Sequence, residues 1–141
     1  MNRPEEIKAG YINSIDKHLK DLVEHKADRM FEVEDFSRIL FIHPTHLSNT
    51  IKDTTGTSAC GIYQLKIMEC ALRLLGDQSL SIKEISLLLT YEPSQFTKWF
   101  KRLTKLTPRQ YRVKLLSSGK GSVNSEIMTI LKKYADIPLC F

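Results

Sequence analysis

Two stretches of the chain share one pattern, and that pattern decides the fold. Residues 36–52 read FSRILFIHPTHLSNTIK, and residues 85–101 read ISLLLTYEPSQFTKWFK. The two align without gaps at an offset of 49 residues. Self-similarity at a fixed offset predicts that one supersecondary unit occurs twice. The aligned positions of like character pair Ser37 with Ser86, Leu40 with Leu89, Pro44 with Pro93, Leu47 with Phe96, Ile51 with Phe100 and Lys52 with Lys101.

Each copy has the layout of a helix-turn-helix. A short apolar helix, a four-residue break ending in Pro and a second, amphipathic helix follow one another in both copies. A small residue, Ser37 or Ser86, lies ten positions before a large apolar residue, Leu47 or Phe96. The small side chain lets two helices cross closely, and the apolar one fixes the second helix. Any pair of packed helices needs such contacts, but the identical spacing in both copies favours the helix-turn-helix.

The segments around the motifs also predict helices. Apolar residues recur every three or four positions between Ile7 and Leu22 and between Ile62 and Leu75, which is the period of an amphipathic helix. No segment shows the alternation of a strand between turn signals. The fold class is therefore all-α: two helix-turn-helix subdomains joined by a long linking helix, a homeodomain-like arrangement. The expected parts are an N-terminal helix within 1–30 that packs on the domain, a double helix-turn-helix domain at 31–116 with motifs at 33–55 and 82–104 and a linking helix at 62–75, and a hinge, short helix and tail at 117–141.

Local signals mark several helix ends. Proline stands where three helices are expected to begin, since Pro lacks the N–H that the first helical position leaves unbonded. Ser81 and Glu84 have the spacing of a capping box. Gly56 and Gly76 follow apolar runs and predict left-handed helix ends. The sequence Ser-Ser-Gly-Lys-Gly at 117–121 predicts a hinge, after which an apolar stripe that includes Tyr134 either folds back on the domain or binds a partner.

Composition excludes several classes of protein. With 141 residues, 42% of them apolar and 26% charged, the chain is expected to be a small globular protein, neither disordered nor a large multidomain enzyme. No apolar run approaches the roughly 18–20 residues that span a bilayer, and the first residues lack the apolar stretch of a secretory signal. Cys60, Cys70 and Cys140 have no CxxC spacing, so neither a disulfide framework nor a zinc site is expected. We expect a reduced, cytoplasmic protein with no membrane partner.

The net charge of +5 is concentrated in one part of the chain. Residues 81–116 hold eight Lys and Arg against two Asp and Glu, whereas residues 31–57 hold two against four. A basic run is often only a solvated face, but within a helical pattern it is a candidate phosphate-binding surface. The acid-free run contains Lys98, Lys101, Arg102, Lys105, Arg109, Arg112 and Lys114.

Five stretches carry a family resemblance: EDFSRILFIHPTHLSNTIKDTTG at 34–56, ALRLL at 71–75, SLSIKEISLLL at 79–89, FTKWFKRLT at 96–104 and TPRQYR at 107–112. Together they resemble the DNA-binding domain of the AraC/XylS family of bacterial transcription regulators. The resemblance implies seven helices, with one long helix joining two helix-turn-helix units. It also implies binding to double-stranded DNA, with the two recognition helices in successive major grooves about 34 Å apart.

Some positions depart from the family pattern. Thr90 and Lys105 stand where the family usually has Gly, and Asn49 and Lys98 stand where it often has a base-contacting Arg. The DNA sequence that this chain reads therefore cannot be taken from a relative. The length resembles that of the family's small single-domain members, which implies a monomer. We expect an activator that contacts RNA polymerase.

Helical periodicity identifies the exposed side chains of the two recognition helices. Asn and Gln pair with adenine, Lys reaches guanine acceptors, and Ser or Thr contacts either base or phosphate. The candidate base readers are Thr45, His46, Ser48, Asn49, Ser94, Gln95, Thr97 and Lys98, with Asn49 and Lys98 foremost. Phosphate contacts fix the register of the protein on DNA but carry no sequence information. The candidates for them are Lys52, Lys101, Arg102, Lys105, Arg109 and Arg112.

The residues also leave an alternative function open. The first motif lies in an acidic segment and lacks the expected Arg, which favours a protein-interaction module on the same fold with weak or lost DNA binding. The chain is not expected to be an enzyme, because no phosphate-binding Gly loop or nucleophile motif occurs. His43 and His46 lack a nearby third ligand, so His43 is expected to cap a helix, and neither a metal nor another cofactor is expected.

Overall fold

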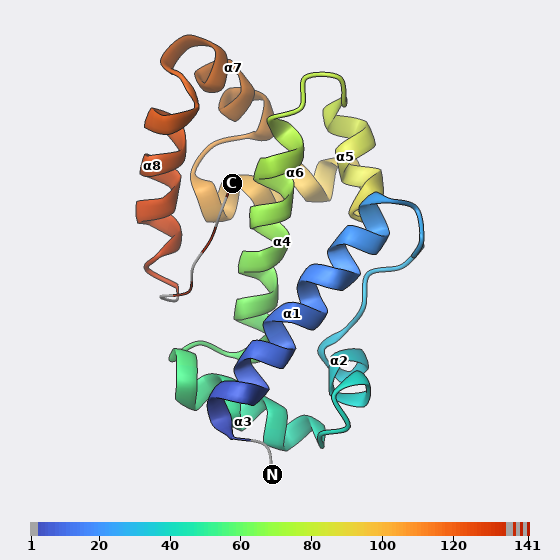
Figure 1. Cartoon of the computed structure of the whole chain (residues 1–141). Coiled ribbons are helices and arrows are strands. Elements are labelled where there is room, and N and C mark those ends of the chain that lie inside the picture. The colour runs from blue at the N-terminus through green and yellow to red at the C-terminus, as the bar shows by residue number, and fades with distance from the viewer. Residues whose placement is uncertain (1–2, 135–136, 138, 140) are drawn as a thin grey trace.

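The computed structural model describes residues 3–134, 137, 139 and 141. Within them the chain forms eight helices and no strand (Figure 1), which confirms the all-α prediction. No helix among these residues has the length and apolar character needed to cross a membrane. The helices are α1 (Pro4–Val23), α2 (Val33–Ile39), α3 (Pro44–Thr55), α4 (Ala59–Leu75), α5 (Ile82–Leu88), α6 (Pro93–Thr104), α7 (Pro108–Ser118) and α8 (Lys120–Leu131).

α4 joins two helix-turn-helix units, one toward each of its ends (Figure 1). α2 and α3 make the first unit and occupy residues 33–55, and α5 and α6 make the second and occupy residues 82–104. α4 begins at Ala59, three residues before the start expected at 62. The earlier start has a local cause, because the Ser58 side chain accepts a hydrogen bond from the N–H of Gly61 at 3.0 Å and caps the helix.

The helix ends follow the local signals with one exception. The capping box at 81–84 forms, and Gly56 ends α3 with a left-handed φ of 77°. Gly76 ends α4 with φ of −68°, so the left-handed end predicted there is wrong. Instead, the Arg112 side chain donates to the carbonyl oxygen of Leu75 at 3.0 Å. This bond satisfies a terminal carbonyl that the helix itself leaves without a partner.

The N-terminal helix α1 is part of the core. It packs against α3 and α4, and the hydroxyl of buried Tyr11 donates to the carbonyl of Ala59 at 2.6 Å. The ammonium of Lys66, on α4, lies 2.9 Å from Asp16 of α1 and 2.8 Å from Glu69. These contacts hold α1 against α4.

The C-terminal part folds back onto the second motif. Gly119 alone separates α7 from α8, so the break lies within the hinge predicted at 117–121 but is confined to one residue with φ of 84°. The neighbouring Ser and Lys residues extend the two helices instead, because α8 gains an apolar face against α6 and α7. Tyr134, expected on that face, lies beyond the end of α8 and is exposed. The packed apolar residues of this part are Val123, Ile127, Leu131, Ile137, Leu139 and Phe141.

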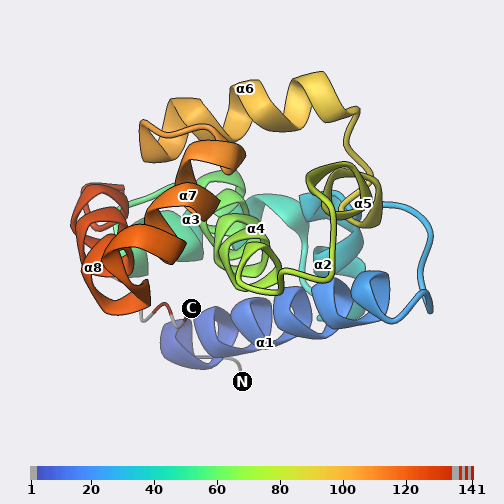
Figure 2. The ribbon, with the colours of Figure 1, turned by 90° about the horizontal axis from the view of Figure 1, so that it is seen from above.

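The recognition helices α3 and α6 have related orientations. Figures 1 and 2 show both running across α4 in roughly the same direction, α3 near its lower end and α6 behind its upper half. Figure 2 shows α1 on the side of α4 away from α6. The linking helix therefore holds two similarly directed helices at a fixed separation.

Candidate nucleic-acid interface

The first recognition helix, α3, buries one face and leaves the other polar. Leu47 and Ile51 are fully buried, as their spacing predicts. His43 is the N-cap, as expected, because its Nδ1 accepts a hydrogen bond from the N–H of Thr45 at 3.1 Å. This cap fixes the backbone where the exposed side chains begin. The exposed predicted residues are Thr45, His46, Ser48, Asn49 and Lys52.

The second recognition helix, α6, has the same division. Phe96 and Phe100 are fully buried, and Trp99 is buried with Tyr91 stacked on it at 5.3 Å between ring centroids. Thr97 is half-buried and so less accessible than its neighbours. The exposed predicted residues are Ser94, Gln95, Lys98, Lys101 and Arg102.

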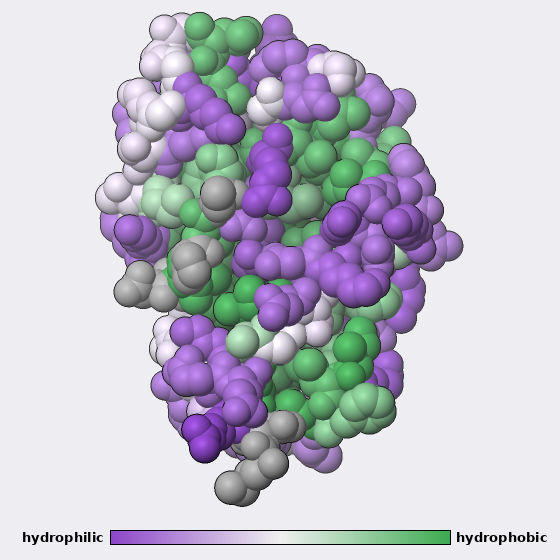
Figure 3. Space-filling view, in the orientation of Figure 1, coloured by the Kyte–Doolittle hydropathy of each residue, from purple (hydrophilic) through white to green (hydrophobic). Residues whose placement is uncertain are grey.

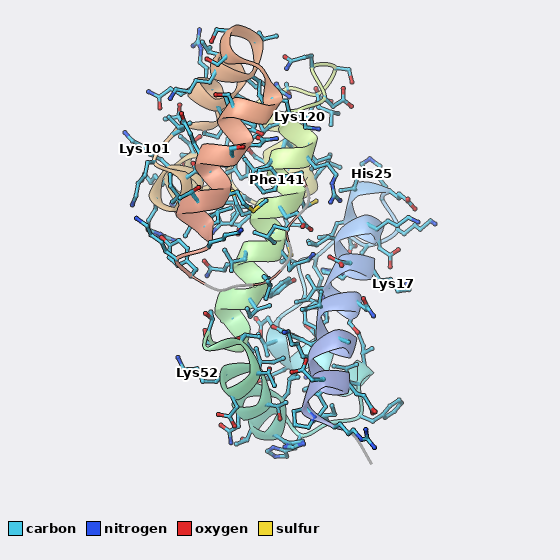
Figure 4. All side chains as sticks on the ribbon, turned by 60° about the vertical axis from the view of Figure 1, so that its left-hand side comes forward. Lys17, His25, Lys52, Lys101, Lys120 and Phe141 are labelled. Atoms are coloured by element: carbon cyan, nitrogen blue, oxygen red, sulfur yellow. The ribbon has the colours of Figure 1, made fainter. Side chains whose placement is uncertain are left out.

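Equivalent lysines of the two motifs lie on one side of the molecule. Lys52 and Lys101 are 49 residues apart, and Figure 4 shows both along one edge of the molecule, Lys101 in its upper part and Lys52 in its lower part. Lys17 and His25 of the α1 region lie along the opposite edge in the same view. These two equivalent residues of the repeat thus lie on the same side of the molecule.

The second motif offers cations without acidic partners. Within the described part of the chain, no carboxylate forms an ion pair with Lys98, Lys101, Arg102 or Arg109. Exposed cations that no neighbouring acid neutralises attract phosphate from a distance. Lys105 is also exposed, and its ammonium donates only to the backbone carbonyl of Arg102, at 3.3 Å.

Arg112 differs from the other predicted phosphate contacts. Its guanidinium donates to the carbonyl oxygens of Leu75 at 3.0 Å and of Asp77 at 2.9 Å. These bonds join α7 to the end of α4, so Arg112 holds α7 against the linking helix. Sequence spacing could not reveal this, because both acceptors lie more than thirty residues away.

The charged residues around α2 pair with one another. The Asp35 carboxylate accepts from both guanidinium nitrogens of Arg29, at 3.1 and 3.2 Å, and from the N–H of Glu32 at 2.7 Å. The hydrogen bonds from Arg29 and from this backbone N–H lower the pKa of Asp35 to about 2. Arg38 adds a hydrogen bond at 2.9 Å. The cations near α2 are thus paired, in contrast to those of the second motif.

An exposed apolar pair in the first motif was not anticipated from the sequence. Phe41 is 95% exposed and Ile39 is 50% exposed. Figure 3 shows apolar surface over α2, at the lower right, and over α7, at the top. One signal could have identified Phe41, because the repeat aligns it with Thr90 in the exposed turn of the second motif.

The described residues give little support for a metal site or for a reactive buried cysteine. In the described residues, no three His, Cys, Asp or Glu side chains gather as metal ligands. Burial raises the pKa of the Cys70 thiol to about 11, which favours the unreactive protonated form. Cys60 is exposed, and Cys140 lies outside the described residues.

Known proteins share this arrangement. A family model described as a helix-turn-helix domain, of the AraC type, matches residues 36–114. An uncharacterized HTH-type transcriptional regulator of Bacillus subtilis (strain 168), YobQ, is 28% identical over 131 residues, which cover 82% of this chain and 54% of the relative. The chain therefore spans about half the length of that relative.

A solved structure gives the same fold. It is described as a DNA-binding transcriptional dual regulator from Escherichia coli K-12, and it superposes with a TM-score of 0.59 at 19% identity. The superposition covers 70% of this chain and 89% of that chain. At this identity the likeness concerns the fold alone.

Proposed function

This chain belongs to the AraC-type helix-turn-helix family of transcription regulators, and from that membership we propose that it binds double-stranded DNA in a sequence-specific manner. α3 and α6 would each enter a major groove, in successive turns of the duplex. The observation that carries the proposal is the shared face of the two motifs. Lys52 and Lys101 lie on one side of the molecule, and both recognition helices are polar where they are exposed.

The two motifs have different roles in this proposal. Asn49 and Lys98 read bases directly, with His46, Ser48 and Gln95 beside them, because their side chains are exposed and match the donor and acceptor pattern of base edges. The second motif supplies most of the non-specific affinity, since its cations are unpaired whereas those near α2 are paired. The phosphate contacts are Lys52, Lys101, Arg102, Lys105 and Arg109.

We place the protein in the cytoplasm as a monomeric activator that contacts RNA polymerase. The exposed pair Ile39 and Phe41 supports a protein contact from the first motif, because a large apolar side chain that is almost fully exposed contributes little to folding. The same pair favours the second candidate function, an interaction module with weak or lost DNA binding.

Selection from a random DNA library tests the proposal. Purified protein is mixed with random duplexes, and bound molecules are recovered and sequenced over several rounds. We expect a motif of about 15–20 base pairs made of two half-sites one helical turn apart. Recovery of no enriched motif would reject sequence-specific regulation, and failure to bind any duplex at low salt would favour the interaction module.

A further inference from the structure

The segment from Gly119 to Phe141, named here the C-terminal brace, lies outside the residues that the family model matches. Its described residues contact the second helix-turn-helix unit and the loop that follows the first one. We propose that the brace fixes the orientation of α6 relative to α3 and thereby determines which spacing between two DNA half-sites the protein accepts. The inference rests on the proposed function, because it concerns how the two recognition helices engage one duplex.

The first half of the brace is fixed to the second motif. α8 packs on α6 and α7 and buries Val123, Ile127 and Leu131. Asn124 is buried beside them, and its Oδ1 accepts a hydrogen bond from the hydroxyl of buried Tyr111 at 2.5 Å. α8 therefore cannot move without α6 and α7.

The brace also reaches the loop that follows the first motif. The Thr57 hydroxyl, in the loop between α3 and α4, donates to the carbonyl of Tyr134, 77 residues away. Thr57 is itself held to the end of α3, because its N–H donates to Thr55 Oγ1 at 3.1 Å and its carbonyl accepts from the same hydroxyl at 3.0 Å. A continuous set of contacts thus runs from α3 through Thr57 to the brace.

The end of the brace closes on the linking helix. Ile137 is 3% exposed and belongs to the common core, and Figure 4 shows Phe141 beside α4. The Asn124 side-chain amide donates to the Phe141 carbonyl at 3.2 Å, which joins the end of the chain back to α8. The described residues of the brace therefore contact α6, α7 and the loop after α3, and Ile137 joins the common core.

A further connection between the second motif and the loop after the first one restricts how the two motifs can rotate relative to each other. α4 joins the motifs through short loops, and α1 and Arg112 hold their parts of the chain against it. The brace adds a further connection at a separate point, between Tyr134 and the loop after α3. With the brace in place the recognition helices move as one body, so a duplex with altered half-site spacing engages only one of them well. Binding by two linked modules is lost when the geometry forbids simultaneous engagement.

The test compares full-length variants on a series of duplexes. The selected site is prepared with its natural spacing and with one or two base pairs inserted or removed between the half-sites, and Kd is measured by fluorescence anisotropy. Thr57→Val removes the hydroxyl that meets Tyr134. Ile137→Asp places a charge where the brace is buried. Thr129→Val is the matched control. It removes a hydrogen bond of the same type, from the Thr129 hydroxyl to the Ser125 carbonyl at 3.0 Å, on the exposed face of α8.

The readout is the ratio of Kd on the altered duplexes to Kd on the natural one. For the wild type and Thr129→Val we expect a rise of about tenfold or more for one inserted base pair, comparable to the cost of a mismatched base. For Thr57→Val and Ile137→Asp we expect a rise of about threefold or less, together with weaker binding at the natural spacing. A variant that is merely less stable lowers the affinity for every duplex by the same factor and leaves this ratio unchanged.

Each result separates the two hypotheses. If the wild type has a preferred site but both variants keep its spacing ratio, or if the wild type shows no spacing dependence, the brace proposal is rejected and the proposed function stands. If the wild type has no preferred site, the proposed function itself fails. Far-UV circular dichroism and thermal melting of each variant confirm that the compared proteins are folded.

Discussion

Phe41 and Thr90 occupy the same place in the turns of the two motifs, and both have a left-handed backbone, with φ of 56° and 64°. The ends of the two recognition helices repeat this equivalence, since Gly56 has φ of 77° and Lys105 has φ of 69°. The internal repeat therefore extends from residue types to backbone conformation. Only one of these four positions has glycine, the residue that adopts a positive φ without steric cost.

Replacing Thr90 with Gly should stabilise the protein. A β-branched residue at positive φ is strained by roughly 1–2 kcal/mol, and the exposed Thr90 side chain provides little packing in return. Glycine at this position also makes the unfolded chain more flexible, which offsets part of the gain. We expect a net rise of about 0.5–1 kcal/mol in the free energy of unfolding, measured by urea denaturation.

Thr129→Gly is the control for that substitution. Thr129 is exposed in the middle of α8, where helical φ angles give glycine no advantage. Glycine should lower stability there by a few tenths to about 1 kcal/mol. A loss of stability in Thr90→Gly would contradict the strain assigned to the turn.

Replacing the foremost base readers should relax specificity. Lys98→Ala and Asn49→Ala each remove an exposed side chain from the centre of a recognition helix. Each should reduce the preference for the selected base at one position by about 1–3 kcal/mol, measured as Kd against duplexes that vary at that position. Retention of the full preference by both variants would exclude these residues from base reading.

Replacing Arg102 should act differently. Arg102→Ala removes an exposed, unpaired cation, so binding should weaken by a similar factor for every duplex. The slope of log K against log salt should become less negative by roughly 0.9, the change expected for one phosphate contact. A change confined to one base position would instead identify Arg102 as a base reader.

Acid should weaken the junction between α1 and α2 through His18. The His18 Nε2 accepts a hydrogen bond from the N–H of Phe31 at 2.9 Å, and the two rings stack at 3.8 Å. Burial lowers the pKa of His18 below its ordinary value, and the positive charge of Arg29 lowers it further, whereas Asp21 and Asp35 act in the opposite sense. Because the folded state binds this proton less readily than the unfolded state, the contribution of His18 is complete above about pH 6.5 and is lost as the pH falls.

Urea denaturation between pH 7.5 and 5 measures this effect. His18→Gln should show a smaller decline of stability with acid, since a Gln side chain has an acceptor but no proton to gain in this range. His46→Gln, at an exposed position, should keep the pH dependence of the wild type. Equal declines in His18→Gln and the wild type would refute the assignment.

The buried charges between α1 and α4 should be sensitive to the loss of one partner. Lys66 is 5% exposed and lies against Asp16 and Glu69, so Lys66→Met removes the ammonium that joins α1 to α4, while Arg73 still lies 3.8 Å from Glu69. We expect a loss of about 1–3 kcal/mol in the free energy of unfolding, part of it recovered by the double variant Lys66→Met/Glu69→Met. Lys17→Met, which breaks the exposed pair with Asp21, should cost no more than about 1 kcal/mol.

The amino-acid sequence by itself determined the helices and their division into two motifs. The proline positions and the capping box at 81–84 are local signals that act within one or two helical turns, and the repeat places the same local pattern in the chain twice. The buried faces of α3 and α6 followed from periodicity for the same reason, because Leu47 and Phe96 face inward wherever their helices pack. Local bonding could therefore be read from short segments of the chain.

Tertiary structure alone decided which polar groups meet across the chain. Arg112 was predicted to contact phosphate, but the end of α4 presents two carbonyl oxygens that accept its hydrogen bonds. Within the hinge predicted at 117–121, the residues on either side of Gly119 are helical, and α8 packs on α6 and α7. The bond between Thr57 and Tyr134 joins residues with no pattern in common. Contacts of this kind depend on where other elements come to lie, and neither residue type nor spacing along the chain encodes that position.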